Sequence, residues 1–198
     1  MSNRKLFTVA SGVTALALVI LTGLYLVGIG GLATATAAEQ GKIIKFDAAE
    51  NMARFSFDET KVFADGLPAH GSSFITEGYL YEYGTLTDSN GVLADGSPEF
   101  PDKVIGKWVC RGWFIGDAAH AESGPWVITT QIYNFGDDIG VETITSEGFE
   151  LADFDVAIGR AITGGTGSYE GATGEVSQVL LGFNQGEGVN LRFELEVK

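Results

Sequence analysis

The chain has 198 residues and carries 26 Asp and Glu against 12 Lys and Arg, a formal net charge of −14. This acidic excess repels phosphate backbones and anionic lipids, which excludes nucleic-acid binding through a basic surface and a polybasic membrane patch. The single cysteine excludes an intrachain disulfide framework and a four-cysteine zinc site. The 28 glycines and the 11% aromatic residues favour strands and tight turns over helices.

Residues 1–38 carry the pattern of an export signal. Arg4 and Lys5 precede a long uncharged run, rich in Leu, Val and Ala, that ends on small residues. Signal peptidase recognises this pattern, so we expect cleavage after Ala37 or Ala38. The run is also long enough to span a bilayer, which leaves an uncleaved N-terminal membrane anchor as the alternative. In both cases we expect residues 39–198 to be extracytoplasmic, either secreted or periplasmic, because the basic residues stay inside.

Residues 39–198 are predicted to form one all-β domain. After a polar stretch over 39–51, aromatic or β-branched runs alternate with Gly, Asp, Asn and Pro. We expect strands at 53–63, 73–85, 104–115, 126–135, 140–151, 154–163, 171–183 and 188–197. Because no long helical period occurs here, the pattern predicts an eight-stranded antiparallel up-and-down barrel, which has no exposed edge. Residues 86–102 are predicted to form a loop over one end of this barrel.

Both faces of the run at 126–135 are rich in apolar residues. A barrel with a wet exterior needs only one apolar face, so we expect the outer face to be covered by other subunits. The sequence therefore predicts a homo-oligomer, either a dimer or a trimer.

A glycine-rich segment at residues 161–176 contains Gly164-Gly165-Thr166-Gly167 and runs on into a predicted strand. Nucleotide-binding loops need a Lys-Ser/Thr pair or a helix after the glycines, so we interpret the segment as a turn and bulge. It closely resembles the matching strand-turn-strand of plant allene oxide cyclases and, more loosely, that of dirigent proteins. The segments at 129–137 and 109–110 extend the match. This resemblance implies an eight-stranded barrel, commonly trimeric, with an apolar cavity and no cofactor.

The resemblance also implies mainly conformational catalysis, with a buried acid on the first strand steering charge. The matching position falls near Ser56, and Asp58 shares its face two residues later, so Asp58 is one candidate catalytic residue. Glu77 is the other, because it alternates with Tyr79 and Tyr81, and a carboxyl desolvated among aromatic rings suits a general acid or base. The alternative for Glu77 is an acid at the barrel rim.

Candidate ligand-binding residues are those that alternate with aromatic or apolar neighbours: Tyr79, Tyr81, Trp108, Cys110, Arg111, Phe114 and Tyr133. For Arg111 and Arg160 the alternatives are pairing with an inward carboxylate, holding a ligand's acid group, or a salt bridge between subunits. Cys110 is more typical of a small buried hydrophobic residue than of a nucleophile. His70 and His120 lack the spacing of metal ligands, so we predict no metal site.

These observations predict a barrel that binds a small apolar molecule, derived from a fatty acid, a polyketide or a terpenoid. Confinement would steer cyclisation or isomerisation of that molecule without a cofactor. A non-catalytic carrier, dirigent-like or lipocalin-like, would use the same cavity, so the sequence leaves open whether the protein is an enzyme. A structural envelope protein is a third hypothesis, and it predicts a barrel filled by its own side chains.

Overall fold

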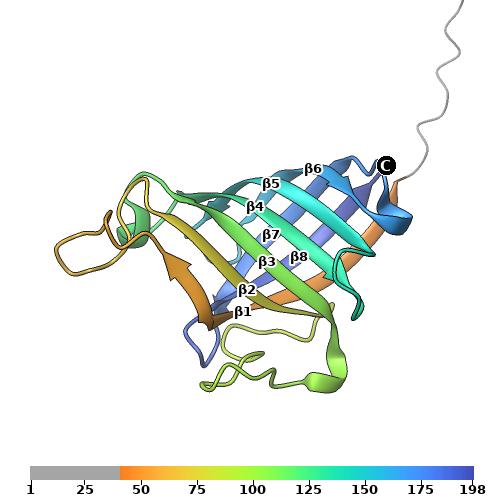
Figure 1. Ribbon diagram of the computed structural model, residues 1–198, viewed down its shortest axis with the longest axis horizontal. Helices are drawn as coiled ribbons and strands as arrows, with labels where there is room; N and C mark the ends of the chain where they lie inside the picture. The colour runs from red at the N-terminus through yellow and green to blue at the C-terminus, as the bar shows by residue number, and fades with distance from the viewer. Residues whose placement is uncertain (1–40) are drawn as a thin grey trace, which may run out of the picture. The chain divides into compact units, whose positions relative to one another are not determined.

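The computed structural model describes residues 41–198, which form a closed barrel of eight antiparallel strands in chain order (Figure 1). The strands are β1 (Lys42–Phe57), β2 (Ser73–Glu82), β3 (Val104–Phe114), β4 (Pro125–Phe135), β5 (Thr143–Leu151), β6 (Ala157–Gly165), β7 (Gly174–Phe183) and β8 (Val189–Val197). This confirms the predicted all-β up-and-down barrel. The predicted signal or anchor segment lies outside the described residues. Within them, no helix has the length and hydropathy needed to cross a membrane.

Strand β1 differs from its prediction, because it begins at Lys42 and includes the stretch interpreted as polar. Its polar side chains find partners far away in the sequence. Arg192 donates from Nε and from its terminal nitrogen to the two carboxylate oxygens of Asp47, at 2.8 and 3.0 Å. The Val189 amide donates to Glu50 Oε2 at 3.0 Å. Such long-range pairing offsets the free-energy cost of burying charged residues, and no local sequence pattern reveals these partners.

The segment 83–103, here called the outer strap, lies along the outer face of β1 and β8 rather than over one end of the barrel. The Leu86 amide donates to Asp47 at 2.9 Å, and Asn190 Nδ2 donates to the Asn90 carbonyl at 2.8 Å. Tyr81 is fully buried beneath the strap, and its hydroxyl donates to a strap carbonyl at 2.6 Å. The loop was therefore predicted correctly, but its location was wrong.

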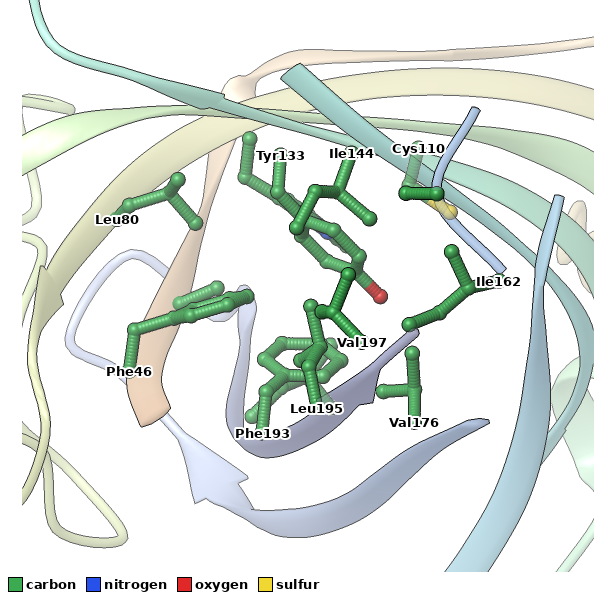
Figure 2. Packing of buried hydrophobic residues seen from close by; sticks show 14 of the residues in the cluster. Phe46, Leu80, Cys110, Tyr133, Ile144, Ile162, Val176, Phe193, Leu195 and Val197 are labelled. Atoms are coloured by element: carbon green, nitrogen blue, oxygen red, sulfur yellow. The ribbon is translucent and has the colours of Figure 1, made fainter. Parts of the chain in front are cut away.

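One end of the barrel interior is filled by apolar side chains (Figure 2). The rings of Phe46, Tyr133 and Phe193 form a triangle with centroid separations of 5.0 to 5.1 Å. Ile144 and Val176 pack into the same cluster, near the β4–β5 and β6–β7 turns. Burial of these side chains supplies the main driving force for closing the barrel.

The glycine-rich segment forms the connection from β6 to β7, as predicted. A short 3₁₀ turn over Gly167–Tyr169 separates the two strands. Gly167 adopts a φ of +61°, and a side chain there would meet the Val141 carbonyl. Backbone geometry thus accounts for this glycine without a phosphate ligand.

Large apolar side chains also occupy the outer face of β3, β4 and β5. Trp113, Ile128 and Phe149 lie side by side across these strands and are 56%, 40% and 47% exposed. This agrees with the apolar outer face seen in the sequence. Coverage of that face by other subunits stays a prediction.

Candidate active site

The other end of the barrel contains a cavity of about 420 Å³. Gly66, Leu67 and Pro68 of the β1–β2 connection, Ala119 of the β3–β4 connection and Glu187 of the β7–β8 turn border it. Its wall is mainly apolar and includes the aromatic residues Phe55, Phe57, Phe74, Trp108, Phe114, Trp126 and Phe183. This volume lies within the range of small-molecule sites. A barrel filled by its own side chains, expected for a purely structural protein, is not what the structure shows.

The two connections that border the cavity are joined to each other. The His120 ring stacks on Phe63 with centroids 4.1 Å apart, and His120 Nε2 lies 2.8 Å from Asp65 Oδ2. The Ala119 amide also donates to the Pro68 carbonyl at 3.2 Å. These contacts fix the rim of the cavity.

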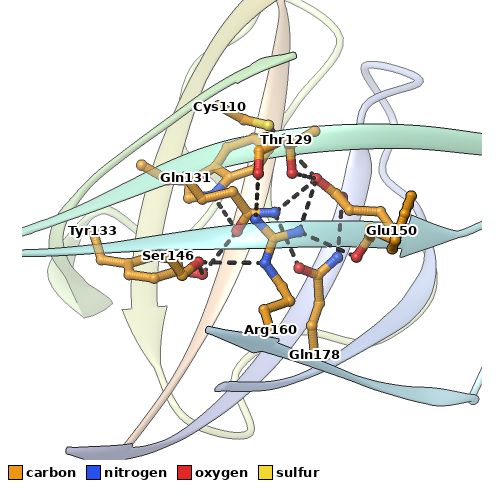
Figure 3. A network of polar contacts seen from close by, with 10 residues as sticks. Cys110, Thr129, Gln131, Tyr133, Ser146, Glu150, Arg160 and Gln178 are labelled. Carbon is orange, nitrogen blue, oxygen red and sulfur yellow. Dashed lines mark hydrogen bonds and ion pairs between the residues drawn. The ribbon is translucent and has the colours of Figure 1, made fainter. Parts of the chain in front are cut away.

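A layer of polar side chains, centred on Glu150 of β5, reaches from the cavity to Tyr133 in the filled core (Figure 3). Glu150 Oε1 accepts hydrogen bonds from Thr129 Oγ1 at 2.6 Å and Gln131 Nε2 at 2.8 Å. Gln178 Nε2 donates to Glu150 Oε2 at 3.0 Å. These donors come from β4 and β7 and match the acceptor-only chemistry of a carboxylate. Glu150, although only 5% exposed, is therefore held in one orientation.

Arg160 of β6 completes this layer and is itself buried. Its terminal nitrogens donate to the carbonyls of Phe149 and Thr129, at 3.2 and 3.1 Å, and its Nε donates to Ser146 Oγ at 3.3 Å. The guanidinium also lies 3.8 Å from Glu150 Oε1. Of the alternatives for Arg160, the structure shows pairing with an inward carboxylate.

Glu50 of β1 is the second buried carboxyl group in the cavity wall, at 6% exposure. Burial raises its pKa, and the Glu150 carboxylate adds to the rise. The Val189 amide opposes this increase by donating a hydrogen bond to the carboxylate. A carboxyl whose pKa is raised retains its proton to higher pH, which suits a proton donor.

The two glutamates therefore differ in environment while facing one cavity. Glu50 is desolvated with few hydrogen bonds, whereas Glu150 is surrounded by donors and a guanidinium. Carboxyl pairs whose environments differ in this way can divide the roles of acid and base between them.

Three further polar atoms belong to the residues of this wall. The Cys110 thiol donates to Glu150 Oε1 at 3.7 Å, and burial raises its pKa well above the ordinary range. Cys110 is thus a neutral thiol rather than an activated nucleophile. Thr76 Oγ1 and Trp126 Nε1 are buried and have no hydrogen-bond partner in the described part of the chain. Unpaired buried donors of this kind are uncommon, and a ligand acceptor would satisfy them.

Four predicted ligand-binding residues come together inside the barrel. Trp108, Cys110 and Phe114, which alternate on β3, line the cavity. Tyr133 lies deeper in the filled core, and its hydroxyl donates to Gln131 Oε1 at 2.9 Å. Tyr133 therefore supports the polar layer and does not line the cavity.

The structure does not bring the remaining predicted residues to the cavity. Glu77 is exposed on the outer face of β2, because Thr76 and Gly78 occupy the inward positions. Asp58 follows β1, where its Oδ1 accepts bonds from the Thr60 amide and hydroxyl at 3.0 and 2.6 Å, and these bonds lower its pKa. It acts there as a turn residue.

Arg111, Tyr79 and Tyr81 also lie on the outside of the barrel. Arg111 is exposed and borders a shallow outer groove beside Trp113. Tyr79 and Tyr81 pack under the outer strap. Their side chains do not face the cavity, and the sequence left this open, because strand alternation defines two faces but not which of them points inward.

Sequence reasoning missed Glu50, Glu150 and the glutamines that hold Glu150. The sequence contained a signal for Glu150, because strand alternation places it on the same face of β5 as the small residues Ser146 and Gly148. Glu50 had none, because it lay in a stretch assigned as polar. Within residues 41–198, no cluster of three or more His, Cys, Asp or Glu has the arrangement of a metal site.

Comparisons with known proteins support the fold alone. No family model matches the chain, and no curated protein matches it. Among solved structures, one pterocarpan synthase dirigent protein has a TM-score of 0.58 at 15% identity, covering 80% of this chain and 95% of its own. A second has a TM-score of 0.56 at 15% identity, with 79% and 83% covered.

A pyocyanin demethylase is also similar in structure, with a TM-score of 0.51 at 14% identity, over 79% of this chain and all of its own. The dirigent part of the resemblance seen in the sequence is therefore confirmed at the level of fold. The allene oxide cyclase part stays a prediction. The chain has the barrel fold that dirigent proteins share.

Proposed function

We propose that this protein binds a small, largely apolar molecule in its barrel cavity and steers the isomerisation or cyclisation of that molecule. The observation that carries the proposal is the pair of buried carboxyl groups, Glu50 and Glu150, in an otherwise apolar cavity. Burying two carboxyl groups costs free energy, and a carboxyl with a perturbed pKa in a cleft, as Glu50 is, is typical of a functional site.

In this proposal Glu50 is the proton donor. Its raised pKa lets the carboxyl hold a proton to higher pH than an ordinary glutamate and pass that proton to the bound substrate. Glu150, held by its donors, supplies a fixed negative charge where positive charge develops. The proton that Glu50 gives up is recovered from another position of the same substrate, so an isomerisation needs no net proton.

The aromatic walls supply the second contribution. Rings from β1, β2, β3 and β4 enclose the ligand, restrict its conformers and exclude water. Holding a flexible molecule in one reactive geometry lowers the entropic part of the barrier.

We further propose that the barrel functions as an exported homo-oligomer. The sequence of residues 1–38 supports export, and the apolar outer face supports association between subunits.

The test begins with the full-length protein purified from its native host. Mass spectrometry of the intact protein under native conditions identifies a co-purified small molecule. That molecule is then incubated with substoichiometric protein, and its conversion is followed by chromatography. Glu50→Gln keeps the shape of the side chain but removes the acid, and we expect it to slow conversion by about 10²-fold or more.

Glu175→Gln is the matched control, because Glu175 is an exposed glutamate on the outer face of the barrel. This variant should convert the substrate at the wild-type rate. Stoichiometric binding without conversion, unchanged in Glu50→Gln, would contradict the catalytic proposal and identify the protein as a carrier.

A further inference from the structure

The charged residues in the lining of the cavity have one sign of charge. Glu50, Glu150 and Glu187 contribute to its lining, and none of its lining residues among those described is a Lys, Arg or His. Arg160, the buried cation behind the wall, is occupied by two carbonyls and the Ser146 hydroxyl. A ligand carboxylate would therefore meet buried acids with no free cation to compensate it.

The aromatic side chains of the wall form a continuous arc. Ring centroids are separated by 5.7 Å from Phe57 to Phe55 and from Phe55 to Phe74, by 5.1 Å from Phe74 to Phe114, and by 6.3 Å from Phe114 to Trp126. The face of an aromatic ring carries partial negative charge and attracts cations. The arc and the carboxyl groups thus favour the same sign of ligand charge.

The charge of the whole chain acts in the same direction. A net charge of −14 raises the local concentration of cations and lowers that of anions. A negatively charged surface around a negatively lined cavity selects against fatty-acid carboxylates in particular.

We infer that the ligand of this cavity is an apolar molecule that carries a positive charge, such as an amine or a nitrogen heteroaromatic cation, held between the aromatic arc and Glu50 and Glu150. The inference deepens the proposed function, because it depends on the cavity being a small-molecule site. The apolar part of the ligand contacts the arc, and its charge lies toward the two carboxyl groups.

Three probes of similar size and different charge test this inference. They are (2-naphthylmethyl)trimethylammonium, its neutral carbon isostere 2-neopentylnaphthalene, and 2-naphthylacetate. Binding to the full-length protein is measured through naphthalene fluorescence at pH 7. We expect the ammonium probe to bind at least tenfold more tightly than the neutral isostere, and the carboxylate to bind least.

A bound cation favours the ionised form of Glu50, so Glu50→Gln should weaken binding of the ammonium probe by about tenfold and leave the neutral isostere unchanged. Glu175→Gln, on the outer surface, should change neither affinity. A circular dichroism melt confirms that each variant is folded before binding is measured.

The outcomes separate the inference from the proposed function. If the neutral isostere binds as tightly as the ammonium, or Glu50→Gln affects both equally, the inference of a cationic ligand is wrong and the small-molecule site stands. If none of the three probes binds, the proposed function itself fails together with the inference.

Discussion

The buried ion pair between Arg160 and Glu150 makes a quantitative prediction possible. Arg160→Met removes the guanidinium while retaining an unbranched apolar side chain. The variant loses three hydrogen bonds, of 3.1 to 3.3 Å, and leaves Glu150 without its cation at 3.8 Å. Breaking a buried pair from one side costs about 3–5 kcal/mol, because a charge is left uncompensated. For a domain whose whole stability is about 5–15 kcal/mol, this is a large loss.

Urea unfolding followed by tryptophan fluorescence measures this loss as a change in the free energy of unfolding. A double-mutant cycle with Glu150→Leu then isolates the interaction between the two side chains. Because Arg160→Met together with Glu150→Leu leaves no unpaired charge, we expect the double variant to be about 2 kcal/mol more stable than the sum of the single losses implies.

Two results would refute the reasoning. A cost below about 1 kcal/mol for Arg160→Met would mean that Glu150 does not need its cation in this site. Strict additivity in the cycle would mean that the two side chains are not coupled.

Three further predictions concern the cavity wall. The pKa of Glu50 is raised above the ordinary glutamate value of 4.5 in the folded chain, so the unfolded chain releases this proton at lower pH. The stability of the wild type should therefore fall with rising pH relative to that of Glu50→Gln. Melting temperatures of the two proteins that run parallel from pH 4.5 to 8 would contradict this. Thr76→Val removes a buried hydroxyl without a partner and should raise the free energy of unfolding by about 1 kcal/mol in a urea titration. Thr129→Val removes the 2.6 Å hydrogen bond to Glu150 and should lower the free energy of unfolding by about 1–3 kcal/mol in the same titration. If both substitutions change stability in the same direction, the assignment of the unpaired hydroxyl is wrong. Cys110, the single cysteine, should react with iodoacetamide at pH 8 at least about tenfold more slowly in the native protein than in urea, because burial raises the pKa of its thiol. Equal rates would show that the thiol is not buried.

Apart from β1, the sequence by itself located the strands, and it predicted their order. Alternating apolar residues marked β8, and Gly and Asp clusters marked the turns, because the period of a strand and the backbone demands of a turn are local properties. On β3 the same alternation correctly grouped Trp108, Cys110 and Phe114 on one face. Antiparallel neighbours joined by short connections then led to a closed barrel.

Only the tertiary structure decided which face of each strand points inward. On β2 both faces carry apolar residues, and closure of the barrel placed Thr76 inside and Glu77 outside. The pairing of β1 with β2 also shifts register between Asn51 and Ser56, so that Glu50 before the shift and Phe55 after it both line the cavity. Such irregularities reverse inward and outward positions, and short-range patterns do not reveal them.

The candidate site depended on the same kind of long-range information. Glu50 is compensated by Val189, and Glu150 by Arg160 and residues on β4 and β7. A buried carboxyl and an exposed one are identical in sequence, since what distinguishes them is the set of partners that folding brings within hydrogen-bonding distance. The sequence therefore determined that a barrel forms, and the closed barrel decided which of its 26 acids face the cavity.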